Sequence, residues 1–253
     1  MSEVEVAADG GVLVITINRP DRRNAVNQAV STGVAGALDQ LDQRDDLAVG
    51  IITGAGGTFC AGMDLGSFRL GERVSLPGRG FAGLTQRPPA KPLIAAVEGY
   101  ALAGGFEVVL ACDLIVAART ATFGLPEVKR GLVAAAGGLF RLPSSLPRHV
   151  AMELILTGDP ISAERALHFG LVNRLTEPGQ ALGEALLLAR AIAANGPLAL
   201  AASKRIVSES RGWPADQAFD RQRPLTDPVF SSEDAREGAL AFLEKRAPVW
   251  QGR

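Results

Sequence analysis

Short apolar runs alternate with amphipathic stretches in the first half of the chain. The run from Val12 to Ile17 is rich in β-branched residues and ends at turn-forming residues, which predicts a strand. Between Val26 and Leu41, apolar residues recur every three or four positions, as on one face of a helix. A second buried strand is predicted from Ala48 to Thr53. A strand, a helix and a strand in this order form a crossover unit, so the pattern predicts an α/β fold with a parallel sheet.

Two further strands are predicted, from Pro92 to Val97 and from Leu114 to Ala117. Glycine-rich loops precede helices that we expect to begin near Met63 and at Phe106. Such loops leave backbone N–H groups free to face a ligand. In a parallel sheet, ligands bind at the carboxyl ends of the strands, and both loops lie at that edge.

Beyond Gly131 the pattern is almost wholly helical. Leu171–Arg174 is predicted as a strand or an extended link, and Ser231 and Asp234 have the spacing of a capping box. We divide the chain into a core domain at 1–195 and a C-terminal helical oligomerisation region at 196–253. The expected helices cover about residues 136–144, 147–156, 162–168, 180–194, 198–210 and 233–246.

Composition excludes several classes of function. Apolar residues make up 47% of the 253 residues and charged residues 21%, as in globular proteins. The net charge of −1 gives no general attraction for nucleic acid or an anionic membrane. No apolar run approaches the about 20 residues of a membrane span, and the N-terminus lacks the basic lead of a signal peptide, so we expect a cytoplasmic protein. Cys60 and Cys112 lack metal-ligand spacing and are predicted to be free thiols.

Three familiar kinds of site are incomplete or absent in the sequence. In the glycine-rich loop 54–59, Phe59 occupies the position where a dinucleotide fingerprint requires glycine. The loop at 99–106 lacks the lysine and hydroxyl residue of a phosphate-binding loop. The two histidines, His149 and His168, both fall in predicted helices and are interpreted as surface residues. A nicotinamide enzyme, a nucleoside triphosphatase and a histidine-based triad or zinc site are therefore disfavoured.

Two carboxylates beside the glycine loops remain as candidate chemistry. Glu107 follows Gly104-Gly105 among apolar neighbours, and Glu127 follows Pro126. An apolar setting raises a carboxyl pKa, and two such groups near one water can share acid and base roles. The N–H groups near Met63 and Gly104 could converge on one carbonyl oxygen as an oxyanion hole. From the residues alone, close helix packing explains the glycines equally well, and a first-turn helix position explains either glutamate.

The chain resembles the crotonase family, the enoyl-CoA hydratases and isomerases, over nearly its full length. The segments that carry the resemblance are Asn18–Pro20 with Asn24-Ala25, Phe59–Leu65, Gly99–Asp113, Phe123–Gly131, Gly137-Gly138, Leu156–Gly158, Gly170–Val172 and Phe242–Arg246. The resemblance implies a spiral core of ββα units and a helical C-terminal trimerisation region. It also implies a homotrimer or a dimer of trimers.

The resemblance further implies a role for each candidate residue. The N–H groups of Met63 and Gly104 would hold the thioester oxygen of an acyl-CoA, Glu107 would deprotonate water, and Glu127 would protonate the α-carbon. Coenzyme A is part of the substrate, and neither a metal nor a separate cofactor is expected. The implied contacts to coenzyme A and substrate are Arg23, Ala25, Ala61, Asp64, Leu65 and Lys245, the last of these reaching a neighbouring subunit.

The favoured activity is addition of water to a trans-2-enoyl-CoA, or the reverse dehydration, because both glutamate positions are occupied. Gly66-Ser67 stand where many hydratases have a lysine, and Ala134–Ala136 replace a proline-glycine pair. These departures, with Lys129-Arg130, resemble carnitinyl-CoA dehydratases. The alternatives are an isomerase or another lyase of the family and, from a different class, a non-catalytic acyl-CoA binder. We expect residues 68–90 to supply the far wall of the acyl pocket.

Overall fold

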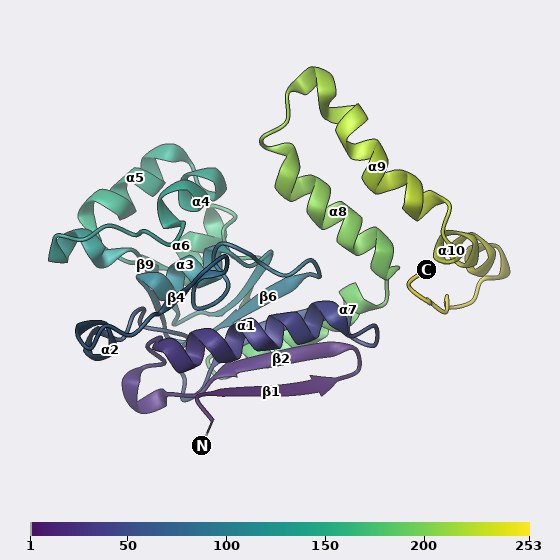
Figure 1. Cartoon of the computed structure of the whole chain (residues 1–253). Coiled ribbons are helices and arrows are strands. Elements are labelled where there is room, and N and C mark those ends of the chain that lie inside the picture. The colour runs from purple at the N-terminus through teal and green to yellow at the C-terminus, as the bar shows by residue number, and fades with distance from the viewer. Residues whose placement is uncertain (1) are drawn as a thin grey trace.

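A six-stranded sheet forms the centre of the computed structural model, which describes residues 2–253 (Figure 1). The strands lie in the order β1-β2-β3-β6-β8-β11; β1 is antiparallel to β2, and the other neighbours are parallel. The predicted parallel crossover sheet is confirmed. The strands are β1 (Val4–Asp9), β2 (Val12–Ile17), β3 (Val49–Gly54), β6 (Leu93–Val97), β8 (Leu114–Ala118) and β11 (Arg174–Thr176).

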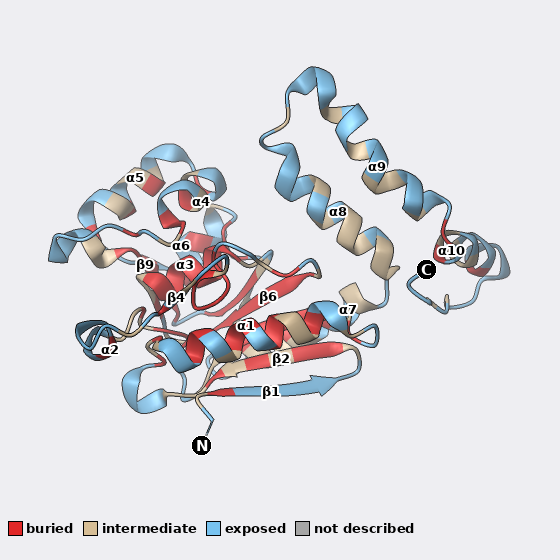
Figure 2. Cartoon of the chain, viewed as in Figure 1, coloured by how far each residue is buried: buried red, intermediate tan, exposed pale blue. Residues whose placement is uncertain are grey.

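The sheet is covered by a helix on each face (Figures 1 and 2). Helix α1 (Gln28–Gln43) packs in one core with Leu13, Ile15 and Ile17 of β2. Val12 of the same strand belongs to a second core, formed with helix α7 (Ala181–Ala193). Because parallel strands are buried on both faces, they form nearly continuous apolar runs in the sequence. The buried side chains of α7 in this second core are Ala181, Ala185 and Ala189, and larger ones such as Leu186 and Ile192 pack at its border.

A second, smaller sheet has the order β10-β9-β7. Two of its strands belong to repeated units of two strands followed by a helix. Strand β6 leads through β7 to α3, and β8 leads through β9 to the 3-10 helix Pro126–Arg130; β7 and β9 pair in parallel. These are the ββα units that the sequence resemblance implied. The elements are β7 (Tyr100–Leu102), β9 (Thr122–Gly124), β10 (Ile161–Ser162), α3 (Gly104–Leu110), α4 (Gly138–Ser145), α5 (Arg148–Thr157) and α6 (Ala163–His168). A short helix and a hairpin lie between β3 and β6, namely α2 (Leu65–Arg69), β4 (Ser75–Leu76) and β5 (Gly80–Phe81).

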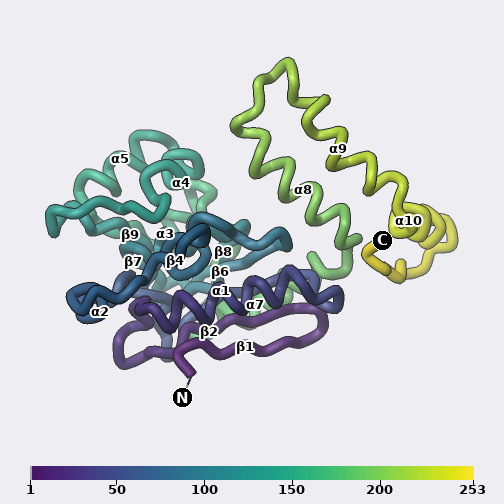
Figure 3. The backbone as a smooth tube through the Cα atoms, viewed as in Figure 1, coloured from purple at the N-terminus to yellow at the C-terminus, as the bar shows by residue number. Residues whose placement is uncertain are grey.

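The C-terminal helices α8 (Pro197–Ser210), α9 (Ala218–Phe230) and α10 (Glu233–Glu244) extend away from the core (Figures 1 and 3). The side chains of α8 and α9 are not buried within this chain. One anchor to the core is the Lys204 Nζ atom, which donates to the Asp113 Oδ2 atom at 2.6 Å. A turn separates α7 from α8 near residue 196. The division into a core domain and an oligomerisation region stays a prediction.

Some elements differ from the sequence-based expectations. Strand β1 escaped prediction because it is an edge strand whose residues after Val4 are exposed. Helix α9 was not predicted because it contains Pro224 and Pro228, which lack the backbone N–H that a helix interior needs. The N-cap of α10 is Ser232, whose Oγ atom accepts the Ala235 N–H at 3.0 Å, so the predicted cap at Ser231 was wrong by one residue.

Candidate active site

A cavity of about 510 Å³ lies where the glycine loops after β3 and β7 meet. Seven of the predicted site residues line it: Arg23, Ala61, Met63, Leu65, Gly104, Glu107 and Glu127. Phe68, Val74 and Phe81 also line the cavity, which confirms that residues 68–90 form part of its wall. The remaining lining is largely apolar, and the further charged side chain in it is Arg130.

Glu107 lies in the first turn of α3 and is only 3% exposed. Its Oε1 atom accepts the N–H of Ala136 at 2.7 Å and the N–H of Gly138 at 2.9 Å. Burial raises the pKa of Glu107, while these two N–H groups and the charge of Arg141 oppose the rise. The carboxyl group is therefore held in one orientation in an apolar wall.

Glu127 lies in the 3-10 helix that Pro126 begins, and its side chain is half-buried. Its Oε2 atom is buried and has no hydrogen-bond partner among residues 2–253. Burial raises the pKa of Glu127; its own backbone N–H opposes this, and the neighbouring charge of Glu107 raises the pKa further. Two carboxyl groups that share a cavity in this way favour a state with one proton between them.

The backbone of the two glycine loops is in close contact at the same cavity. Gly62 has φ of +100°, and a Cβ atom placed there would lie 3.3 Å from the Gly104 nitrogen. Ala103, next to Gly104, has φ of +52°, which is strained for a residue with a side chain. In the described part of the chain, neither the Met63 N–H nor the Gly104 N–H donates to a protein acceptor. Both donors remain free for a ligand.

The structural alternatives for the glycines and glutamates also hold. A Cβ atom on Gly104 would lie 2.5 Å from the Phe81 ring, and one on Gly105 would lie 2.3 Å from the Cys60 carbonyl oxygen. Close packing therefore requires both glycines. Each glutamate does occupy the first turn of its helix. These structural roles and the chemical roles are compatible, because the packing brings the Gly104 amide to the cavity wall.

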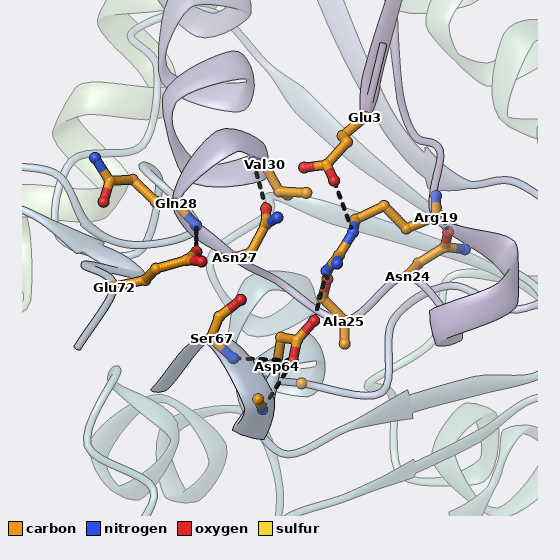
Figure 4. Close-up of polar contacts among 12 residues, drawn as sticks. Glu3, Arg19, Asn24, Ala25, Asn27, Gln28, Val30, Asp64, Ser67 and Glu72 are labelled. Carbon is orange, nitrogen blue, oxygen red and sulfur yellow. Dashed lines mark hydrogen bonds and ion pairs between the residues drawn. The ribbon is translucent and has the colours of Figure 1, made fainter. Parts of the chain in front are cut away.

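Three of the predicted binding residues lie outside the cavity. Asp64 caps α2 by accepting the N–H groups of Gly66 and Ser67, and it pairs with Arg19 (Figure 4). The Ala25 carbonyl oxygen accepts from the same arginine at 2.5 Å. Lys245 is the C-cap of α10 in the C-terminal region and does not line the cavity. The binding roles of these residues stay predictions.

Two residues that support Glu107 carry no individual signal in the sequence. Ala136 acts through its backbone N–H, which no side-chain pattern reveals. Arg141 lies in the predicted helix 136–144, and its Nη2 atom donates to the Thr85 carbonyl oxygen at 2.7 Å. The charge of Arg141 acts on Glu107. Only its position on the inner side of α4 distinguishes it from a surface arginine.

Several other sequence-based expectations can be compared with the structure. His149 and His168 are exposed on helices, as predicted, and both cysteines are free. Within residues 2–253, no group of three or more His, Cys, Asp or Glu side chains could hold a metal ion. No single helix in the same range is both long and apolar enough to cross a membrane.

Known proteins identify the family to which this chain belongs. The sequence profile of the family "Enoyl-CoA hydratase/isomerase" matches residues 7–253. A crystal structure of enoyl-CoA hydratase from Mycobacterium tuberculosis H37Rv superimposes with a TM-score of 0.99 at 60% identity, covering 100% of both chains. The chain therefore belongs to the enoyl-CoA hydratase/isomerase, or crotonase, family of enzymes. This confirms the expected family, fold and lyase class.

Two curated relatives name different substrates within this family. Enoyl-CoA hydratase EchA19 of Mycobacterium tuberculosis is 43% identical over 96% of this chain and 94% of its own length. Carnitinyl-CoA dehydratase of Salmonella typhi is also 43% identical, over 100% of both chains. Because the identity to these two relatives is equal, it does not separate the two activities.

Proposed function

We propose that the protein adds water to trans-2-enoyl-CoA to give 3-hydroxyacyl-CoA, and catalyses the reverse dehydration. The observation that carries the proposal is the placement of Glu107 and Glu127 in one apolar cavity with two free backbone N–H groups. Water must be activated beside a polarised double bond in this reaction, and the cavity holds groups suited to both tasks.

The surroundings of the two carboxyl groups favour different protonation states. Although burial raises the pKa of Glu107, hydrogen bonds from two backbone N–H groups and the charge of Arg141 stabilise its anion. Glu127 has an unpaired buried oxygen and is repelled by the charge of Glu107, which favours its neutral form. We therefore assign Glu107 as the base and Glu127 as the acid in the direction of hydration.

In this mechanism, the Glu107 carboxylate takes a proton from water while the water oxygen bonds to the β-carbon. The π electrons of the double bond move through the α-carbon toward the thioester oxygen, where the N–H groups of Met63 and Gly104 stabilise the negative charge. Glu127 then gives its proton to the α-carbon. A proton then passes from Glu107 to Glu127, directly or through solvent, which restores both groups and balances the cycle. The reverse sequence is dehydration.

The chemistry is tested by replacing each glutamate with glutamine. Glu107→Gln and Glu127→Gln are each expected to lower the turnover of crotonyl-CoA and longer enoyl-CoAs by at least ~100-fold, because each removes a proton-transfer group. Binding of butyryl-CoA, a saturated thioester that cannot be hydrated, should change little when measured by calorimetry. A double variant that hydrates enoyl-CoA at the rate of the unaltered protein would rule out this mechanism.

A second candidate is a carnitinyl-CoA dehydratase-like lyase, favoured by the relative of that name and by Ala134–Ala136 and Lys129-Arg130. The cavity argues against it: its basic side chains are Arg23 and Arg130, and its carboxyl groups are the two catalytic candidates. A cationic acyl group would find no further anion there. Product analysis with enoyl-CoA and carnitinyl-CoA substrates separates hydration, dehydration and isomerisation.

The remaining expectations extend the same proposal. The substrate is an acyl-CoA thioester, and the reaction needs no metal or separate cofactor, because the protein groups described supply the proton transfers and the charge stabilisation. We propose a homotrimer or a dimer of trimers in the cytoplasm. Activity that survives dialysis against a chelator would support the statement that the reaction needs no metal.

A further inference from the structure

Arg19 lies at the centre of a polar cluster beside the candidate oxyanion site (Figure 4). Its side chain is only 13% exposed. The Nε atom lies 3.2 Å from the Glu3 Oε1 atom, and the Nη1 atom lies 3.0 Å from the Asp64 Oδ2 atom. The same Nη1 atom donates to the Ala25 carbonyl oxygen. The guanidinium group therefore joins the start of the chain, the 19–26 turn and the loop that contains Met63.

Asp64 completes this connection at both its backbone and its side chain. The Asp64 N–H donates to the Val26 carbonyl oxygen at 2.9 Å, and the Val26 N–H donates to the Gly62 carbonyl oxygen at 2.8 Å. These two bonds flank Met63, whose own N–H stays unpaired within the described chain. Although burial alone would raise it, the pKa of Asp64 is held below its usual range by hydrogen bonds from Ser67 and Arg19.

We propose that Arg19, acting through Asp64, is a positioning residue that fixes the Met63 peptide so that its N–H group faces the thioester oxygen. The inference deepens the proposed function and rests on it for the identity of the bound carbonyl group. It also gives Asp64 a role other than the direct substrate contact that the family resemblance implied. The arginine touches no substrate; it orients the residue next to a donor that does.

Loss of the Arg19–Asp64 ion pair should weaken stabilisation of the transition state more than it weakens substrate binding. An N–H group that lies off the line to the thioester oxygen loses part of a contribution worth about 10²–10³ in kcat. Neither Arg19 nor Asp64 lines the cavity, so KM should change little. Because Asp64 keeps the N–H groups of Gly66 and Ser67, the cap of α2 survives in Arg19→Gln.

The experiment compares Arg19→Gln, Arg19→Lys and Asp64→Asn with the control Arg44→Gln. Arg44 forms the same kind of ion pair with Asp46, at 2.5 Å, on the exposed surface. For each variant, kcat and KM are measured with crotonyl-CoA. The infrared C=O stretch of bound butyryl-CoA, a saturated thioester that cannot be hydrated, reports the strength of the oxyanion hydrogen bonds directly.

In Arg19→Gln and Asp64→Asn we expect kcat to fall at least ~10-fold with KM within ~3-fold, and the C=O band to move toward its position in free butyryl-CoA. Arg19→Lys should recover part of kcat and part of the shift of the C=O band, since lysine keeps the charge but not the forked donors. Arg44→Gln should match the unaltered protein in both.

An unchanged kcat and C=O band in Arg19→Gln would overturn the proposal. So would a raised KM with unchanged kcat and band in Asp64→Asn, which would assign that residue to direct binding. The infrared measurement needs binding but no turnover. It therefore tests the positioning role even if the glutamate variants disprove hydration, and failure of the two proposals can be told apart.

Discussion

The Oε1 atom of Glu107 lies 2.9 Å from the amide nitrogen of Gly138. This contact joins α3 to the start of α4. In the chain, β8, β9 and the 3-10 helix Pro126–Arg130 lie between these two helices. A Cβ atom on Gly138 would lie 3.2 Å from the same carboxylate oxygen and 3.0 Å from the Leu125 side chain. The orientation of the proposed base therefore depends on the absence of a side chain at residue 138.

Gly138→Ala should lower kcat about 10-fold or more, because a small displacement of a catalytic group strongly raises the energy of the transition state. KM should change little, since the cavity wall that holds the acyl chain is untouched. Gly36→Ala is the matched control: Gly36 lies in α1, and a Cβ atom there would have no neighbour within 4 Å. Steady-state kinetics on both variants checks the prediction, and equal activity in the two would contradict it.

The two glutamates should titrate as a coupled pair. The charge of Glu107 raises the pKa of Glu127, so Glu107→Gln should lower the pKa of Glu127. In the unaltered protein, activity should decline as pH rises through the raised pKa of Glu127, because the acid then loses its proton. Infrared titration of the labelled carboxyl groups checks the shift. A pKa of Glu127 that is the same with and without Glu107 would show that the groups do not interact.

Much of the fold follows from local sequence signals. The buried strands β2, β3, β6 and β8 were predicted within one residue because a run such as Val12–Ile17 is apolar on both faces. Strand β1 and helix α9 were not predicted. The first depends on pairing with β2, and the second contains Pro224 and Pro228, so tertiary contacts override local preference in both.

Side-chain identity and glycine spacing mark much of the candidate site in the sequence. Glu107 and Glu127 were found because charged residues among apolar neighbours are conspicuous, and both line the cavity. The support from Ala136 is invisible in the sequence, because its contribution is a backbone N–H. The use of Asp64 as a cap and ion-pair partner rather than a cavity residue depends on chain geometry that one sequence does not specify.

Glu107 should also make the stability of the protein depend on pH. Its folded-state pKa is raised by burial, so the folded protein binds a proton more strongly than the unfolded chain. Stability linked to this group is fully present below the unfolded pKa, near 4.5, and is lost as pH rises through the raised value. A tenfold difference in proton affinity between the folded and unfolded states corresponds to about 1.4 kcal/mol of stability.

Glu107→Gln should therefore raise the free energy of unfolding at pH 8, because glutamine keeps an oxygen for the Ala136 and Gly138 N–H groups without a buried charge. The gain should shrink as pH falls toward 4.5. Denaturant melts of both proteins across this range check the sign. A gain that grows at low pH would mean that the carboxyl group is more acidic in the folded protein than in the unfolded chain.

The C-terminal helices leave large apolar side chains uncovered in the single chain. Phe230 at the end of α9 and Phe242 in α10 are each 82% exposed. Clustered apolar exposure of this kind is typical of subunit interfaces. We therefore expect light scattering to give about three or six times the chain mass of 26.4 kDa.

Phe242→Glu should reduce the measured mass toward that of one chain, because burying an unpaired carboxylate opposes association. Val6→Glu on the edge strand β1 should leave it unchanged. A monomer in the unaltered protein at micromolar concentration would contradict the proposed trimer.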